Sequence, residues 1–214
     1  MIGAGTLITL PVKDPARAKQ RLSGVLTAEA RADLVLGLFR RNLAIIRQSA
    51  PGAAVLVVTS SPVVAAIASE YGAHLQTEST PLGLNGAVSL ATSWALMNSV
   101  RRHLILHADI ACLDGSELQT LLALELAPPA IALCPADDGG TNALMMCPPG
   151  VLEPSYGLHS AAAHIREAQA KDIAVTSLKL ENMAFDIDTP EDYARFSAGG
   201  GLKAAAFKTI KQAS

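Results

Sequence analysis

Three aspartates stand in contexts that suit a divalent cation. Asp109 ends a run that begins with the apolar residues 104–106, a pattern typical of a buried strand with a carboxylate at its end. Asp186 and Asp188 are two residues apart, so in an extended segment both side chains lie on one face. Carboxylate oxygens on one face are the ligands that hard divalent cations prefer. A helix cap or turn is the competing interpretation of Asp109.

A basic loop follows the apolar segment 6–12. Its four cations, Lys13, Arg17, Lys19 and Arg21, occupy nine residues. Arginine binds phosphate through a planar fork and lysine as a point charge, so the loop is a candidate cradle for a triphosphate. A solvated basic surface is the alternative interpretation, and composition alone does not decide between them.

Two later segments could bind an anion. The turn at 137–144 contains Gly-Gly-Thr-Asn between two apolar runs, and it offers backbone amides and the Thr141 hydroxyl. Gly157 precedes an alanine-rich helix for which Ser160 is the expected cap, and a helix amino terminus attracts phosphate or carboxylate. An ordinary hairpin turn would also use glycine and asparagine. His164 is expected to be a packing residue rather than a catalytic one.

The segment 78–87 has the composition of a loop that runs into a helix. Gly83 and Gly86 would let backbone amides approach a base or a ribose. Asn85 is expected to cap the helix at 87–100, and hydrogen bonding to a base edge is the alternative.

Apolar runs and amphipathic segments alternate along the chain and predict an α/β domain with a parallel sheet. Strands are expected at 6–12, 54–59, 73–77, 104–109, 130–135 and 174–180. Helices are expected after Thr27, at 63–71, 87–100 and 114–126, after Ser160, and after Thr189. Ligands of such sheets bind beyond the carboxyl ends of the strands, where Asp109 would lie.

Composition limits the class of protein. The 214 residues are 50% hydrophobic with a formal net charge of −2, which suits one α/β core and no general nucleic-acid partner. Residues 1–198 are expected to form the domain, and 199–214 a flexible hinge and tail. No long apolar segment indicates a membrane span or signal peptide, so a cytoplasmic location is expected. The three cysteines, Cys112, Cys134 and Cys147, are expected to be reduced core thiols.

Six motifs occur in an order that resembles a known family. The sequence between residues 6 and 196 is similar to the CofC/FbiD-type guanylyltransferases of deazaflavin coenzyme F420 biosynthesis. That family usually has proline where this chain has Ala111. The matching segments are PVK-x5-AK-x-RL (Pro11 to Leu22), GLN-x-A (Gly83 to Ala87), Ala108-Asp109-Ile110, GGTNAL (Gly139 to Leu144), YG-x-x-S (Tyr156 to Ser160) and DIDTPED (Asp186 to Asp192).

The resemblance implies a single-domain, Rossmann-like GT-A nucleotidyltransferase with a mixed, mostly parallel sheet and helices on both faces. It implies transfer of GMP from GTP to a small phosphorylated three-carbon acid, which is 2-phospho-L-lactate, phosphoenolpyruvate or 3-phosphoglycerate, with release of pyrophosphate. A molybdenum-cofactor or sugar-phosphate nucleotidyltransferase, and a nucleotide-binding module without catalysis, are the alternatives. A homodimer is compatible with the sequence.

The same resemblance implies residue roles. One or two Mg²⁺ ions are expected on Asp109, Asp186 and Asp188. The expected acceptor-binding residues are Thr141, Gly157 and Ser160. The expected nucleotide-binding residues are Lys13, Lys19, Arg21, Gly83 and Asn85, and the catalytic residues are Lys19, Arg21 and Asp109.

Overall fold

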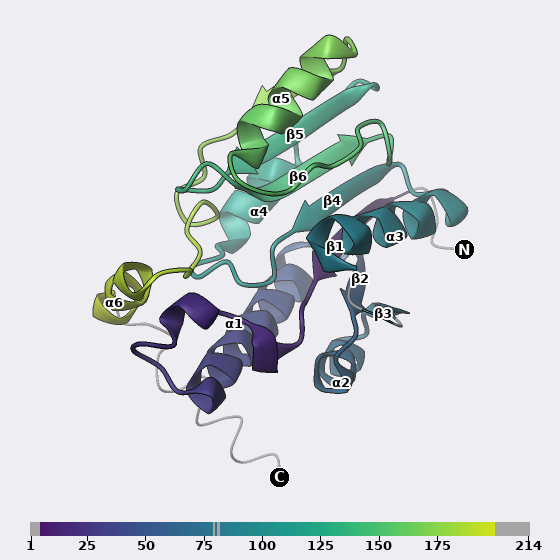
Figure 1. Ribbon diagram of the computed structural model, residues 1–214. Coiled ribbons are helices and arrows are strands. Elements are labelled where there is room, and N and C mark those ends of the chain that lie inside the picture. Colours follow the sequence, from purple (N-terminus) through teal and green to yellow (C-terminus); the bar gives the residue numbers. More distant parts are fainter. Residues whose placement is uncertain (1–4, 79, 81, 200–214) are drawn as a thin grey trace.

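The computed structural model describes residues 5–78, 80 and 82–199 and is built around a seven-stranded sheet (Figure 1). The strand order is β3-β2-β1-β4-β6-β5-β7. All neighbouring pairs are parallel except those of β6, which is antiparallel to both β4 and β5. The strands are β1 (Thr6–Pro11), β2 (Ala54–Thr59), β3 (His74–Thr77), β4 (Arg102–Leu106), β5 (Ala130–Pro135), β6 (Thr141–Cys147) and β7 (Ala174–Ser177). The expected mixed, mostly parallel sheet is confirmed.

Helices cover both faces of this sheet. Buried side chains of α1, α2 and α4 pack on one face, and those of α3 and α5 pack on the other. The helix α6 packs against the start of α1 and the segment before it. The helices are α1 (Ala28–Ser49), α2 (Pro62–Glu70), α3 (Gly83–Met97), α4 (Gly115–Leu122), α5 (Ser160–Ala170) and α6 (Pro190–Ala198).

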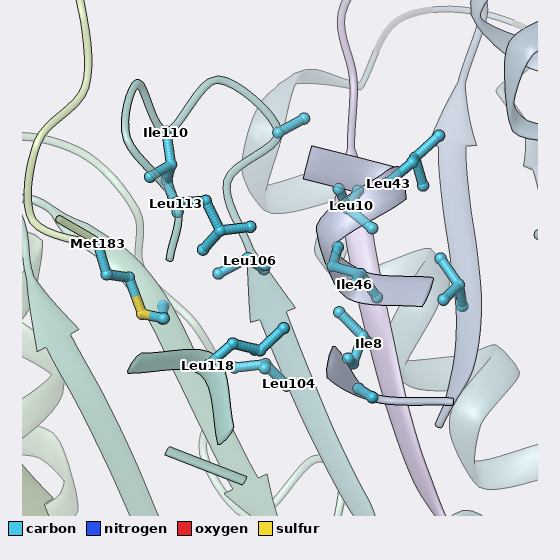
Figure 2. Packing of buried hydrophobic residues seen from close by; sticks show 14 of the residues in the cluster. Ile8, Leu10, Leu43, Ile46, Leu104, Leu106, Ile110, Leu113, Leu118 and Met183 are labelled. Atoms are coloured by element: carbon cyan, nitrogen blue, oxygen red, sulfur yellow. The ribbon is translucent and has the colours of Figure 1, made fainter. Parts of the chain in front are cut away.

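The central strands are buried on both faces, as the continuous apolar runs predict. Ile8 and Leu10 of β1 pack with Leu43 and Ile46 of α1 (Figure 2), whereas Leu7 lies in the cluster on the opposite face. The period-two alternation of a strand produces this division. Strand β4 lies in the middle of the sheet, and its side chains pack in the apolar clusters on both faces. The position of the residues that follow it is therefore fixed by the core.

Several element boundaries differ from the sequence-based expectation. The expected helix at 87–100 begins four residues earlier, at Gly83, whose φ of 72° lies in the region that favours glycine. The expected helix at 114–126 ends at Leu122, and the guanidinium of Arg102 donates to the carbonyls of Leu122 and Leu124 there. The expected strands at 104–109 and 174–180 end at Leu106 and Ser177.

The helix caps and the state of the cysteines can also be compared with the sequence-based expectation. Thr27 and Thr189 cap α1 and α6 through their side chains, as predicted. The three cysteines are free, and only Cys112 is partly exposed. Within the described part of the chain, no helix has the length and apolar character needed to cross a membrane. Most of the predicted tail, residues 200–214, lies outside the described residues.

Candidate active site

A cleft of about 470 Å³ opens at the carboxyl ends of the central strands. Residues after β1, β2, β3 and β4 line it, together with the start of α3, the β5–β6 turn and the segment before α5. This is the edge at which ligands bind in open α/β sheets. The cleft is thus where the sequence motifs converge.

Three carboxylates line this cleft, those of Asp109, Asp186 and Asp188. Asp109 follows β4, and a β-bridge between Ile110 and Asp186 joins its turn to the segment that carries Asp186 and Asp188. Burial, and then the charges of Asp109 and Asp188, raise the pKa of Asp186 to about 7. Shifts of pKa that combine burial with neighbouring charges are common at functional sites.

Lys19 lies between two of these acids. Its ammonium group forms ion pairs with Asp109 and with Asp188, the latter at 2.8 Å, and its side chain is only 4% exposed. Burial by itself lowers the pKa of Lys19, but the two carboxylates outweigh it and the pKa lies above its usual value. Burial by itself raises the pKa of Asp109, but Lys19 and His107 outweigh it and lower that pKa to about 2. Both partners are therefore charged at neutral pH.

The donor set of the acids fits a hard divalent cation. Burial is the main cause of the raised pKa of Asp186, and a cation beside the three carboxylates would relieve the repulsion that adds to it. Two of the three acids, Asp109 and Asp188, form ion pairs with Lys19. Among the described residues, no three acids, histidines or cysteines are arranged so that they could hold a metal ion. Asp109, Asp186 and Asp188 are the residues that would hold Mg²⁺, and this assignment stays a prediction.

The turn that carries Asp109 is held by hydrogen bonds from α1. The fully buried Asn42 donates to the carbonyls of Ala108 and Ile110, at 3.1 and 3.0 Å. Arg41 donates to the carbonyl of Ala111 at 2.7 Å. The Ala111 amide donates to the carbonyl of Phe185 at 2.9 Å, a bond that proline could not make. The departure from the family pattern thus leaves this turn firmly tied.

A second buried asparagine holds the other acidic segment. Asn142 of β6 donates to the carbonyls of Met183 and Ala184, at 3.1 and 3.2 Å. Glu117 of α4 accepts hydrogen bonds from the backbone amides of Asn182 and Met183. The backbone leading to Asp186 is thereby fixed from two directions.

Replacing Asn42 by leucine is expected to lower turnover about tenfold and to destabilise the protein by about 1–3 kcal/mol, because two buried carbonyls lose their donor. Steady-state kinetics and urea unfolding would measure the two effects. Asn98→Leu is the matched control, since the Asn98 side chain donates to the carbonyl of Trp94 near the end of α3, away from the turn that carries Asp109. Equal rate losses in the two variants would show that Asn42 does not position Asp109.

The charge on Asp186 also predicts a pH dependence of stability. Its folded pKa of about 7 exceeds the ordinary 3.8, so stability is lost as the pH rises from about 4 through 7. Asp186→Asn cannot titrate and is expected to become more stable than the parent, by on the order of 1 kcal/mol, as the pH crosses this window. Urea unfolding in a chelator, at several pH values, would test this. A constant difference across that range would contradict it.

The cations of the basic loop separate in space. Lys13, Arg17 and Lys19 line the cleft, whereas Arg21 is exposed in the 3-10 helix Gln20–Leu22 and does not line it. The structure therefore does not bring Arg21 to the other candidate residues. Arg17 was counted among the cations of this loop but was assigned no role from the sequence. The structure shows that it lines the cleft.

The second anion-binding segment is assembled differently from the expectation. Ser160 is the first residue of α5 rather than its cap; His159 precedes the helix with φ of 55° and makes no side-chain cap. The Ser160 hydroxyl instead lies 3.0 Å from the Thr141 hydroxyl. Gly157 also lines the cleft, with φ of 153° and no heavy atom within 4 Å of where a Cβ would lie. Thr141, Gly157 and Ser160 thus share one wall.

Asn85 does not occupy the place expected of it. It lies in the first turn of α3, where Leu82 precedes the helix without a side-chain cap. The side-chain oxygen of Asn85 accepts a hydrogen bond from the backbone amide of Tyr156 at 2.7 Å. The side-chain nitrogen of Asn85 donates to the backbone carbonyl of Tyr156 at 3.1 Å. Asn85 is therefore neither a cap nor part of the cleft lining, while Gly83 lines the cleft. Its amide group instead ties α3 to the segment before α5.

The cleft lining also includes polar residues that were assigned no role from the sequence, among them Glu78, His107, Asp138 and Tyr156. The rings of His107 and Tyr156 lie 5.6 Å apart. In the described part of the chain, the buried atoms His107 Nε2 and Tyr156 Oη have no hydrogen-bond partner. His107 directly follows the buried strand β4, and this place at the carboxyl end of a central strand was a usable signal.

Comparison with known proteins identifies the family of the chain. The family model described as "Guanylyl transferase CofC like" matches residues 6–209. A 3-phospho-D-glycerate guanylyltransferase of Colwellia psychrerythraea is 42% identical over 187 residues, covering 87% of this chain and 89% of the relative. A phosphoenolpyruvate guanylyltransferase of Rubrobacter xylanophilus is 36% identical over 196 residues, covering 91% and 94%.

Solved structures share the fold at low sequence identity. A nucleotidyl transferase from Methanothermobacter superposes with a TM-score of 0.65 at 9% identity, covering 97% of this chain and 99% of that one. A 4-diphosphocytidyl-2C-methyl-D-erythritol synthase from Anaerococcus prevotii has a TM-score of 0.62 at 11% identity, with coverage of 92% and 96%. With the fold, the cleft and the family match in agreement, the chain belongs to the CofC-like guanylyl transferase family.

Proposed function

We propose that this protein transfers GMP from GTP to the phosphate of a small phosphorylated three-carbon acid and releases pyrophosphate. The observation that carries the proposal is the cleft itself. Three carboxylates and Lys19 lie on one side of it, and the paired hydroxyls of Thr141 and Ser160 lie on another. These groups would provide a place for a nucleoside triphosphate and a place for a second anion in the same cleft.

The proposed chemistry needs positioning and charge more than proton transfer. An acceptor phosphate is anionic at neutral pH, so one of its oxygens attacks the α-phosphorus of GTP without a general base. The bond from the α-phosphorus to the bridging oxygen breaks, and pyrophosphate leaves with that electron pair. The main barrier is the repulsion between two anions, which correctly placed cations reduce.

The residues divide between the two substrates. Lys13, Arg17 and Lys19 are the cations available to the triphosphate. Asp109, Asp186 and Asp188 would hold one or two Mg²⁺ ions, which supply positive charge to the reacting phosphates. Thr141, Gly157 and Ser160 would bind the acceptor through hydroxyl and backbone groups.

The names of the relatives narrow the acceptor. The Colwellia relative is named for 3-phospho-D-glycerate and the Rubrobacter relative for phosphoenolpyruvate, so these two acids are the first candidates here. 2-Phospho-L-lactate is the third candidate, from the resemblance described above. The product would serve deazaflavin coenzyme biosynthesis, and a cytoplasmic location belongs to the same proposal.

A pyrophosphate-release assay tests the proposal. The purified protein with Mg²⁺, GTP and each of the three acids in turn should release pyrophosphate with at least one acid. ATP in place of GTP, and GTP without an acid, are the controls. If no acid supports release above the control without acid, the proposed function is wrong.

A further inference from the structure

A buried histidine is hydrogen-bonded to the pair of hydroxyls formed by Thr141 and Ser160. His164 of α5 is fully buried, and its Nδ1 lies 3.1 Å from the Thr141 hydroxyl, which lies 3.0 Å from the Ser160 hydroxyl. On the other side of the ring, the Ser155 amide donates to Nε2 at 3.0 Å. Thr141 and Ser160 line the cleft, whereas His164 does not. The chain of hydrogen bonds therefore runs from a backbone amide through His164 to the cleft wall.

The direction of the hydrogen bonds follows from the Ser155 amide. A backbone N–H can only donate, so Nε2 of His164 must be the unprotonated acceptor. The single ring proton then lies on Nδ1, and this N–H donates to the Thr141 oxygen. Burial lowers the pKa of His164, so the ring stays neutral at neutral pH.

The fixed tautomer decides what the hydroxyl pair offers to a ligand. Because Thr141 accepts from His164, neither hydroxyl hydrogen is used on the ring. One of the two hydrogens makes the bond between Thr141 and Ser160, and the other is used in neither of these bonds and can be donated to a ligand. With the opposite tautomer, Thr141 would donate to the ring and Ser160 to Thr141, and no hydroxyl hydrogen would remain.

We propose that His164 is a positioning residue that turns the Thr141 and Ser160 hydroxyls into a net donor aimed at an anionic oxygen of the acceptor. This inference rests on the proposed function, in that it takes this wall of the cleft to bind the acceptor acid. His164 would act through Thr141 and would not touch the acid. A donor to a charged oxygen contributes more to binding than one to a neutral group, so the direction of this bond matters.

Two substitutions separate this role from simple support of the chain. In His164→Asn the side-chain amide nitrogen can take the place of Nδ1 and donate to Thr141, but the bond from Ser155 is lost. In His164→Gln the side-chain oxygen can take the place of Nε2 and accept from Ser155, but Thr141 loses its donor. We expect His164→Gln to raise KM for the acid about tenfold with KM for GTP unchanged, and His164→Asn to stay within about threefold of the parent.

A second background tests whether His164 acts through Thr141. In a chain that already carries Thr141→Val, adding His164→Gln should change KM for the acid no further, because the donor has no partner left. Independent losses that multiply would overturn the inference. The inference would also be overturned if His164→Asn were the impaired variant and His164→Gln were not. That result would show that the role of His164 is to hold the backbone at Ser155.

Binding measurements keep this test apart from the proposed function. Calorimetric titration of 3-phospho-D-glycerate or phosphoenolpyruvate into the parent and both variants needs no turnover. If the parent binds an acid but releases no pyrophosphate, the proposed function fails, but the affinities still test the inference. The expected order is that His164→Asn binds the acid about as tightly as the parent and that His164→Gln binds it more weakly. Equal affinities in all three proteins would overturn it.

Discussion

Replacing Asp109, Asp186 or Asp188 by asparagine, one at a time, is expected to lower turnover on the order of a hundredfold or more. Each substitution removes one negative charge and one proposed metal ligand while leaving side-chain volume nearly unchanged. The three side chains line one cleft, and burial, followed by the charges of Asp109 and Asp188, raises the pKa of Asp186 to about 7. The fold should persist, because none of the three belongs to the apolar clusters of the sheet.

The measurement is the initial rate of pyrophosphate release across a Mg²⁺ titration. Asp33→Asn is the matched control, since Asp33 is an exposed residue of α1 outside the cleft and should keep the parent rate. Circular dichroism and urea unfolding would establish that each variant is folded. Near-parent rates in all three variants at saturating Mg²⁺ would refute the metal assignment.

Lys19→Met should be the most damaging change in the basic loop, with kcat/KM for GTP lowered on the order of a hundredfold. The substitution keeps most of the aliphatic volume but removes the ammonium group that pairs with Asp109 and Asp188. It also leaves the charge of the partly buried Asp109 without its main partner, which costs stability. Some loss of stability should accompany the loss of rate.

Arg21→Met is the comparison that makes this test sharp. Arg21 belongs to the same loop and carries the same charge, yet it is exposed and does not line the cleft. We expect kcat/KM for GTP to stay within about twofold of the parent, because an isolated exposed charge contributes little. A loss in Arg21→Met as large as that in Lys19→Met would instead support the role assigned to both residues from the sequence motif.

Much of the architecture follows from local sequence. The strand at 54–59 and the strand at 130–135 are recovered with the predicted bounds, since uninterrupted apolar runs have few other stable placements. The caps Thr27 and Thr189 are likewise local, because each side chain bonds to an amide only three residues away. The order of motifs, and the family resemblance they carry, were also present in the sequence.

The division of the site was decided only by the tertiary structure. Lys19 meets Asp109 and Asp188 across 90 and 169 residues, so no local pattern distinguishes it from Arg21, two residues away. Asn85 has the composition of a cap but bonds to Tyr156, 71 residues along the chain. Sequence patterns report the interactions that a residue makes within its own helix or strand. Contacts at the carboxyl edge of the sheet depend on which strands become neighbours, and strand order is set by the packing of the whole chain.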